Sequence, residues 1–368
     1  MIQCKKHGGG ILMKAIICRE FKNYMKNPIY WIGILVLLIS IYSGLSNYLD
    51  IHLFLGNQEI EQMEEVNPTD ADVINGYIPT TTEEQLDIGL NNIKQIFIDS
   101  YDMTEQEAEQ AIQEVKSQKL SVAGTIKCLE EEYQFYDGKA VFIEAEQKKA
   151  TADELNNYIK SRLSEHSYAY YFTKKFVDFT GLHIAFFSGI LLVFLFIRDM
   201  KKDTYELLHT KPISAGSYVM GKYLGGIFPL SLAVLIIMII FIILCQMNNL
   251  QTNILDTFSN MLIGTVLYVM PTVLIITGIY VLISLMFRNP LPALPLILTY
   301  IVYSNMGSYD ANGYYGFYGR ILGMLFRFEG GFFETEPLPV FLLNQIALLI
   351  VTVLFISIGI WKWRKKRL

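Results

Sequence analysis

The sequence predicts an all-α membrane protein with about six transmembrane helices and a mainly helical or α+β extracytoplasmic domain inserted after the first helix. Hydrophobic residues make up 52% of the 368 residues, and the mean hydropathy is positive, which is too apolar for an ordinary soluble domain. These residues gather into uncharged runs as long as a helix that crosses ~30 Å of hydrocarbon. The acidic residues gather in one long segment after the first run.

The uncharged runs give six candidate spans without Asp, Glu, Lys or Arg: Ile29–Leu49, Phe179–Ile197, Tyr223–Cys245, Met261–Phe287, Leu291–Asn305 and Val340–Trp361. We interpret them as helices, because an open sheet edge is unsatisfied in lipid and the alternation of a membrane barrel is missing. The fifth run is short and begins with Pro292 and Pro295. It is therefore either a full span or a broken, partly re-entrant segment.

The distribution of charge predicts the orientation of the chain in the membrane. Residues 50–175 contain 25 of the 35 acidic residues but only 11 of the 30 basic ones. The basic excess lies in residues 14–26, 198–222 and 362–367 and at Arg288. The positive-inside rule places these segments and both termini in the cytoplasm, so residues 50–178 form an acidic extracytoplasmic domain.

Residues 1–28 are expected to form a cytoplasmic amphipathic helix before the first span, 29–49. Its apolar side chains, including Ile17 and Phe21, recur at helical spacing, and Lys22 and the other cations lie largely elsewhere. Such a helix lies on anionic lipid head groups or docks on a cytoplasmic partner, and the sequence favours neither.

The glycine-rich stretch before Met13 resembles a ribosome-binding site translated in frame. We therefore expect the natural chain to begin at Met13. A signal peptide cleaved near residues 44–46 is a weaker alternative, because the apolar run starts late.

The acidic domain, residues 50–178, begins with an irregular polar stretch, Gly56–Thr82, and continues as helices. Thr104 followed by Glu107 is a capping box, and Ala152–Ser164 repeats apolar residues at helical spacing. The acidity of the domain fits either a cationic ligand or a merely solvated surface.

Cysteines and histidines predict no metal site and no disulfide framework. The cysteines are Cys4, Cys18, Cys128 and Cys245, and the histidines are His7, His52, His166, His183 and His209. The histidines are scattered singly, which excludes metal-ligand spacing. One bridge, between Cys128 and Cys245, is topologically allowed.

No catalytic or cofactor-binding motif is found in the sequence. Gly216–Lys222 matches part of a phosphate-binding loop, but Tyr223 stands where Ser or Thr should hold magnesium. The spans lack the mid-membrane ionisable residues that ion-coupled carriers commonly use. The chain is therefore expected to be no enzyme and to need no cofactor. Free energy for uphill transport would then enter through the cytoplasmic face.

The loop 198–222 resembles the cytoplasmic loop of type-2 ATP-binding-cassette (ABC) permeases. The matching residues are Thr204, Glu206, Leu207, Leu208, Lys211, Pro212, Ile213, Ser214, Gly221 and Lys222, with Asp203 in place of the usual Gly. The resemblance implies that residues 204–214 hold the coupling helix that fits a cleft on the ATPase. It also implies a second ATPase contact at Ile17, Phe21 and Lys22.

By this resemblance, the chain is the permease subunit of an exporter in the bacterial plasma membrane. The implied partners are a cytoplasmic ABC ATPase, a second permease subunit in a homo- or heterodimer, and the lipid bilayer, but no nucleic acid. The alternative is a membrane-anchored sensor or assembly scaffold whose outer domain binds a ligand.

Residues 179–368 contain the five later spans and, between the last two, an aromatic segment, 307–339. Its many Tyr and Phe residues suit the head-group region of the outer leaflet. The segment is expected to anchor the protein there or to line an exit for amphipathic cargo.

Overall fold

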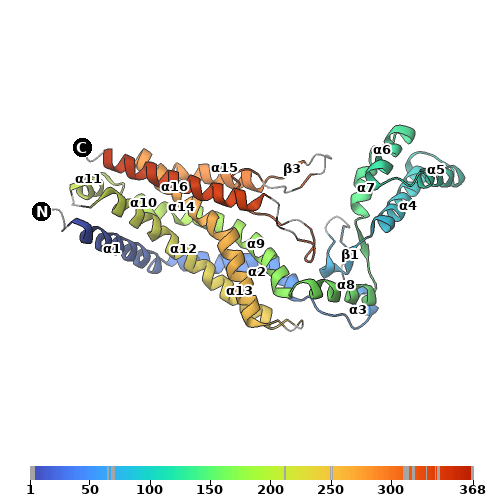
Figure 1. Cartoon of the computed structure of the whole chain (residues 1–368), viewed down its shortest axis with the longest axis horizontal. Coiled ribbons are helices and arrows are strands. Elements are labelled where there is room, and N and C mark those ends of the chain that lie inside the picture. Colours follow the sequence, from blue (N-terminus) through green and yellow to red (C-terminus); the bar gives the residue numbers. More distant parts are fainter. Residues whose placement is uncertain are drawn as a thin grey trace. The chain divides into compact units, whose positions relative to one another are not determined.

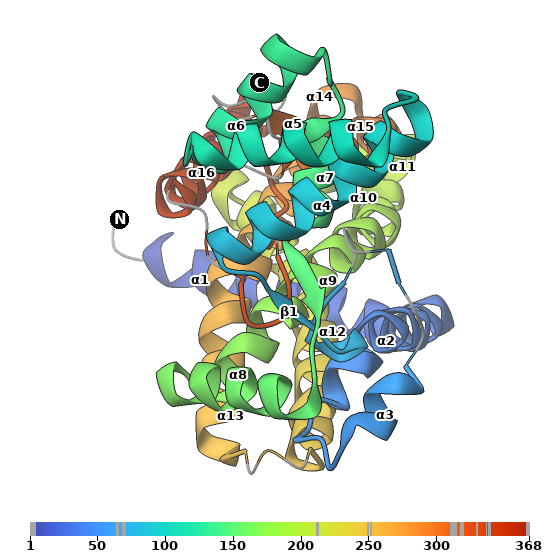
Figure 2. The ribbon, with the colours of Figure 1, turned by 90° about the vertical axis from the view of Figure 1, so that its right-hand side faces the viewer.

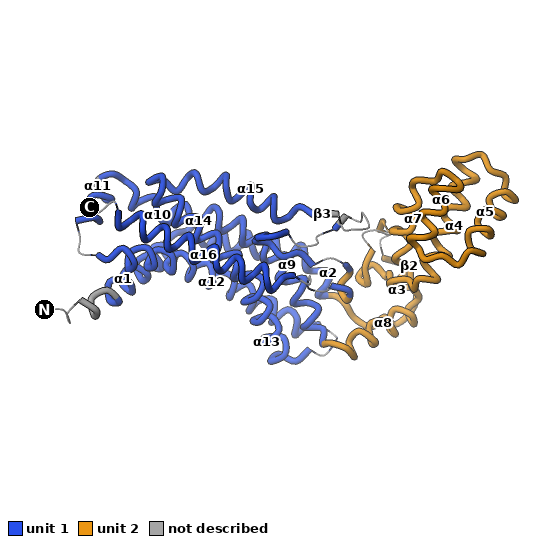
Figure 3. Tube along the Cα trace, turned by 45° about the horizontal axis from the view of Figure 1, so that its top comes forward, with its two compact units in different colours: residues 1–49, 167–330, 334–368 blue, residues 50–166, 331–333 orange. Residues whose placement is uncertain are grey.

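The computed structural model describes residues 5–63, 66–67, 71–210, 213–248, 250, 252–309, 315–316, 320–328, 330–335, 337 and 340–365. The chain divides into two compact units (Figure 3). Unit 1 contains Met1–Leu49, Ser167–Gly330 and Glu334–Leu368, and unit 2 contains Asp50–His166 and Gly331–Phe333. Helices dominate both units, which confirms the predicted mainly helical fold.

Unit 1 is a bundle of helices that run alongside one another (Figure 1). Its elements are α1 (Lys5–Met25), α2 (Pro28–Leu49), α9 (Tyr168–Leu191), α10 (Val193–Ile197), α11 (Lys202–Thr210), α12 (Ala215–Gln246), α13 (Ile254–Gly264), the π-helical turn η3 (Thr265–Val269), α14 (Met270–Phe287), α15 (Ala293–Asn305), the short strands β3 (Ser308–Tyr309) and β4 (Tyr315–Gly316), and α16 (Phe341–Lys365).

Five helices in the described part of the chain are long and apolar enough to cross a membrane. They are Pro28–Leu49, Tyr168–Ile197, Ala215–Gln246, Ile254–Phe287 and Phe341–Lys365. The fifth predicted span is α15, an apolar helix of 13 residues, which is shorter than an upright span requires. Whether α15 crosses the membrane stays a prediction.

The centre of unit 1 is formed by α9, α12 and α14. Helix α9 packs against α2, α13, α14 and α15, while α14 packs against α12 and α16. In the end-on view, α2 and α16 lie towards opposite sides of this unit (Figure 2). Both helices expose many large apolar side chains, as expected for surfaces that lipid solvates.

Two glycines allow α2 to approach α9 closely. An added Cβ at Gly33 would lie 2.3 Å from the ring of Phe187, and one at Gly44 would lie 2.3 Å from the ring of Phe179. The two glycines lie about three turns apart on one face of α2. Small residues of this kind let helices pack tightly where lipid supplies no hydrophobic driving force.

Helix α9 begins before its apolar run, so three charged side chains lie in its early turns. All three are buried and bind the segment that precedes α16. Lys174 Nζ donates to the carbonyl of Thr335, Lys175 Nζ donates to the carbonyl of Gly330 at 2.7 Å, and Asp178 Oδ1 lies 2.5 Å from Arg327 Nε. The charges therefore fasten part of the aromatic segment to α9.

The aromatic segment is only partly described, and Tyr314, Phe317 and Tyr318 lie outside the described residues. Its described part has buried aromatic side chains. Phe326 and Phe328 lie 5.2 and 5.0 Å from the ring of Tyr268, measured between ring centroids. These rings pack against the bundle.

Unit 2 combines helices with one small sheet. Its elements are α3 (Asn57–Glu61), the 3₁₀ turn η2 (Val73–Asn75), β1 (Tyr77–Pro79), α4 (Thr82–Ser100), α5 (Glu105–Ser117), α6 (Val122–Tyr133), α7 (Gly138–Glu144), β2 (Gln147–Lys149) and α8 (Ala152–Glu165). Strands β1 and β2 are antiparallel, with Tyr77 opposite Lys149. The stretch predicted to be irregular, Gly56–Thr82, thus contains α3, η2 and β1, while the extracytoplasmic position of the unit stays a prediction.

The core of unit 2 lies between α4, α5, α6 and α7. Phe97, Phe135 and Phe142 are its largest buried side chains. Cys128 is buried in the same core as a free thiol, and Cys245 is also free, so the structure does not form the bridge allowed by the sequence. Cys4 lies outside the described residues.

Three helices of unit 2 begin with the same capping box. The predicted box of Thr104 and Glu107 is confirmed, and Thr81 with Glu84 and Thr151 with Glu154 form two more. In each box the Thr side chain accepts from the amide of the third helical residue, and the Glu side chain accepts from the Thr amide. The same sequence signal could have identified all three.

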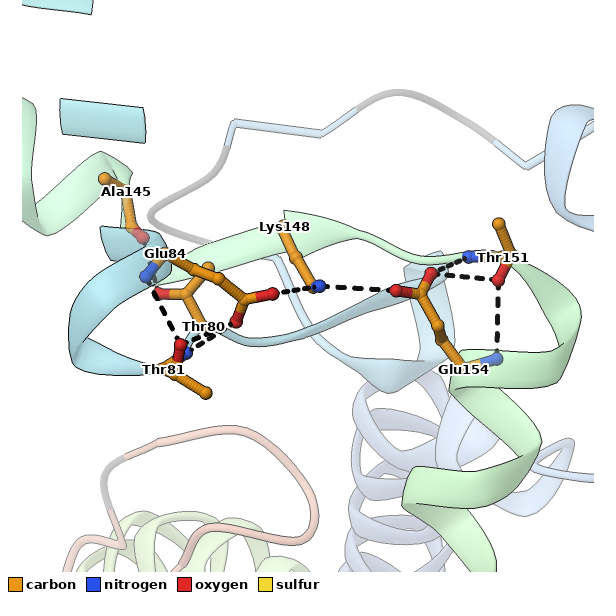
Figure 4. Close-up of polar contacts among 7 residues, drawn as sticks. All are labelled: Thr80, Thr81, Glu84, Ala145, Lys148, Thr151 and Glu154. Atoms are coloured by element: carbon orange, nitrogen blue, oxygen red, sulfur yellow. Dashed lines mark hydrogen bonds and ion pairs between the residues drawn. The ribbon is translucent and has the colours of Figure 1, made fainter. Parts of the chain in front are cut away.

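Lys148 of β2 joins two of these capping boxes (Figure 4). Its Nζ lies 2.5 Å from Glu84 Oε1 and 3.3 Å from Glu154 Oε1. Lys148 and the Thr81 amide hold the pKa of Glu84 at about 2, below its ordinary value of 4.5. One cation therefore stabilises the first turns of both α4 and α8.

Lys148→Met should loosen the starts of α4 and α8, because both carboxylates lose their shared cation. We expect faster hydrogen exchange in these turns, equivalent to a local loss of about 0.5–1 kcal/mol. The depressed pKa means that the contribution of Glu84 is complete above about pH 4.5 and lost as the pH falls towards 2. The difference from the wild type should shrink over this range.

Exchange would be measured by mass spectrometry on the full chain, with Lys160→Met as the control. Lys160 is exposed on α8 and makes no ion pair with a described residue. Equal exchange in both variants would contradict the role of Lys148.

Candidate functional site

The loop that carries the permease-like motif forms helix α11 and an extended link to α12. Tyr205, Leu208 and His209 follow helical spacing, which places them on one face of α11. Ser214 then caps α12, since its hydroxyl accepts from the amide of Ser217 at 3.1 Å. The predicted site residues Lys211 and Pro212 lie outside the described residues.

One face of α11 packs on the last helix of the bundle. Tyr205 and Leu208 are buried, and the ring of His209 lies 4.0 Å from that of Trp363 on α16. Trp363 in turn stacks on Tyr218 of α12, with 3.9 Å between ring centroids. Aromatic stacking therefore joins α11, α12 and α16.

Arg288, directly after α14, also contacts this packed face. Its guanidinium lies 4.9 Å above the ring of Tyr205. Burial raises the pKa of the Tyr205 hydroxyl, although Arg288 opposes the shift. A cavity of about 430 Å³ beside these groups is also lined by Lys202 and Glu206. Lys202 and Arg288 thus give this cavity two cations beside one carboxylate.

The rest of the surface of α11 is exposed, and Glu206 also lines the cavity shared with Tyr205 and Arg288. Glu206 is exposed, and Leu207 is 56% exposed. Thr204 is partly buried. The predicted coupling residues thus differ in their exposure to solvent. Glu206 and Leu207 are presented outwards, whereas Leu208 and, in the link, Ile213 are buried.

A cluster of buried charges lies in the same bundle, around Lys222 of α12. Lys222 Nζ lies 3.0 Å from Glu20 Oε1 on α1 and 2.7 Å from Asp199 Oδ2, which follows α10. It also donates to the carbonyl of Leu195 at 2.8 Å. All three ionic side chains are at least 94% buried, so each charge depends on its partners.

Two further groups complete this cluster around Asp199. Arg19 Nη2 lies 3.3 Å from Asp199 Oδ1, and the Tyr218 hydroxyl donates to Asp199 Oδ2 at 2.9 Å. Tyr218 also stacks on Trp363, so the charge cluster and the aromatic contacts of α11 share one side chain. The cluster balances two carboxylates with two cations, which limits the cost of burial.

The resemblance to a phosphate-binding loop is explained by this arrangement. Gly216–Lys222 forms the first turns of α12, and Lys222 is engaged by carboxylates rather than exposed to a nucleotide. Sequence analysis missed Glu20 and Asp199. Glu20 lies in an amphipathic helix and Lys222 at the edge of an apolar run, but a sequence pattern does not pair them.

The predicted second contact lies on α1 beside α12. Ile17 and Phe21 are partly buried, and Lys22 is exposed. They line a groove of about 440 Å³ with Phe228 and Leu235 of α12. The two apolar residues therefore face an apolar groove that includes part of a membrane-length helix.

The comparison with family models gives a match. The family model of the ABC-2 family transporter protein matches residues 14–314, which is more than half of the chain. Comparisons with curated proteins and with solved structures found no match. The match includes the second half of α1, the charge cluster, α11 and the first four membrane-length helices. The chain therefore belongs to the ABC-2 transporter family, as a multi-pass membrane permease component.

Proposed function

We propose that this chain is the permease subunit of an ABC exporter and that a separate ATPase docks on α11. The observation that carries this proposal is the two-sided character of α11. One face is packed on Trp363, and the rest of its surface leaves Glu206 and Leu207 exposed. A short helix held in this way can receive force from a soluble partner and transmit it to the membrane helices.

The packing gives two routes for the force. Trp363 connects α11 to α16, and Tyr218 connects the same contact to α12. Close-packed side chains transmit displacement because they leave little free volume. Movement of α11 would therefore shift the ends of α12 and α16 together.

The buried charge cluster adds α1 to this moving group. Separating Glu20 or Asp199 from Lys222 would leave a buried charge without its partner, which is expensive. Helix α1, the end of α10 and α12 should therefore move together when α11 is displaced. The predicted ATPase contact at Ile17, Phe21 and Lys22 lies on α1 and would therefore move with these helices.

The charge distribution supports a cytoplasmic position for α11 and both termini. The proposed complex contains this chain, a second permease subunit and ABC ATPase subunits in a bacterial plasma membrane. Unit 2 would then lie outside the cell. The family match favours transport over the alternative of a membrane-anchored sensor or scaffold, while export follows from the resemblance of the loop.

Glu206→Arg combined with Leu207→Asp should weaken docking of the ATPase, because it reverses one exposed charge and removes an exposed apolar contact. We expect roughly tenfold to thirtyfold weaker association. Co-purification and titration with the cognate ATPase would measure this loss. The matched control is Leu255→Asp, since Leu255 is also exposed but lies at the start of α13. Unchanged association of the double variant would contradict docking on α11.

Trp363→Leu should separate docking from coupling. It leaves Glu206 and Leu207 in place but removes the aromatic contacts that join α11 to α12 and α16. We expect binding of the ATPase within about twofold of the wild type and a clear loss of ATP-driven transport in proteoliposomes. Full transport by this variant would argue against the aromatic route.

Lys222→Met should destabilise the permease, because it leaves Glu20 and Asp199 buried without their cation. We expect a loss of about 3–5 kcal/mol, measured as a lowered unfolding temperature in detergent. Adding Glu20→Gln and Asp199→Asn should recover part of the loss, since the charges are then neutral. No recovery would show that Lys222 contributes through packing alone.

A further inference from the structure

A second feature of unit 1 lies where α1 ends, α2 begins and α10 ends. A cavity of about 500 Å³ is lined there by residues of all three helices and by Lys222. The span that contains α2 begins at Pro28, and the span that contains α10 ends at Ile197. The cavity therefore lies at the boundary between hydrocarbon and head groups.

The position of Trp31 supports this boundary. Its indole Nε1 donates to the carbonyl of Met25 at 2.9 Å, and the ring is 47% exposed. Tryptophan side chains of this kind gather at the membrane interface, where one part is apolar and one part is polar.

The lining of the cavity contains more cationic than anionic side chains. Four cations, Arg19, Lys26, Arg198 and Lys222, face two carboxylates, Glu20 and Asp199. The carboxylates already bind Lys222 and Arg19. Lys26 and Arg198 are exposed and make no ion pair with any residue that the structure describes. These two cations leave the cavity suited to an anion.

The start of α2 adds polar groups to the cavity, while the ends of α1 and α10 bring the negative ends of their dipoles to it. Pro28 and Ile29, its first two residues, line the cavity, so the positive end of the helix dipole faces the same space. Asn23 and Asn27 also line it; the Asn23 side-chain amide donates one hydrogen to Glu20 Oε2 at 3.4 Å, and its second N–H and the Asn27 amide can donate to a ligand. The excess positive charge of the cavity therefore comes from Lys26 and Arg198.

The remaining wall of the cavity is apolar. Ile29, Phe194 and Ile197 line it, and each is exposed. They belong to two helices that enter the hydrocarbon from this boundary. A ligand that fits has an anionic head beside Lys26 and Arg198 and apolar chains along these three residues.

We propose that this cavity binds the phosphate group of an anionic phospholipid from the surrounding leaflet. Lys26 and Arg198 bind the phosphate, Asn23 and Asn27 bind the polar head group, and the acyl chains lie along Ile29, Phe194 and Ile197. A free phosphate ion would use the polar groups but not the apolar wall. A bound lipid would also cover the open side of the Glu20–Lys222–Asp199 cluster, because these residues line the same cavity.

The test is native mass spectrometry of the full chain in detergent, titrated with phosphatidylglycerol. The wild type should retain a bound lipid, and Lys26→Gln with Arg198→Gln should bind it at least roughly tenfold more weakly. The conservative pair Lys26→Arg with Arg198→Lys should keep binding within a few-fold. Lys14→Gln is the matched control, because Lys14 is exposed on α1 but does not line the cavity.

Phosphatidylcholine and inorganic phosphate serve as the other two ligands, with thermal stability as a second readout. We expect phosphatidylglycerol to raise the unfolding temperature of the wild type but not of the Gln pair, and the other two ligands to have little effect. Equal stabilisation by phosphatidylcholine would show that charge is not recognised. Equal stabilisation by inorganic phosphate would reject a lipid as the ligand. Either result, or full lipid binding by the Gln pair, would overturn the proposal.

Discussion

The ion pairs of Lys222 constrain much of unit 1. A charged amine inside a helix bundle is costly unless opposite charges remain within contact distance, and Lys222 has carboxylates at 3.0 and 2.7 Å. These carboxylates come from α1 and from the turn after α10, so neither element can leave α12 without exposing a buried charge. Tyr218 extends the constraint to Trp363 and hence to α11. The position of the proposed docking helix is thus linked to electrostatics as well as to packing.

The same arrangement explains how one region can serve a partner and a membrane. Helix α11 presents Glu206 and Leu207 on its outward face, whereas the cations at the ends of α1 and α10 line a cavity next to apolar residues. A soluble ATPase and a phospholipid would therefore contact different residues. Both would act on helices held by the Lys222 cluster, so lipid composition and ATPase docking can influence one another through shared elements.

Local sequence patterns predicted the elements far better than their contacts. The apolar run before Leu49 ends where α2 ends, and Thr104 with Glu107 identified a helix start, because both signals involve neighbouring residues. The motif around Glu206 likewise located α11. Burial of Lys222 could not be predicted in this way, since its partner Glu20 is 202 residues away. Only folding brings such charges together, so the position of Lys222 directly before an apolar run does not indicate its ionic partners.

Helix α9 also begins earlier than the predicted span, and the reason is again a set of contacts between residues that are distant in sequence. Lys174, Lys175 and Asp178 would be unfavourable beside lipid. The span predicted from hydropathy therefore begins after them, at Phe179. The structure makes these charges favourable in the helix by pairing them with the segment that precedes α16. Charged side chains in α9 and α12 thus bind carbonyls or opposite charges that are distant in sequence, at the ends of the apolar runs. Apart from these charged residues, α9 and α12 contain no Asp, Glu, Lys or Arg. Their apolar lengths suit helices that shift against one another when a partner moves their ends.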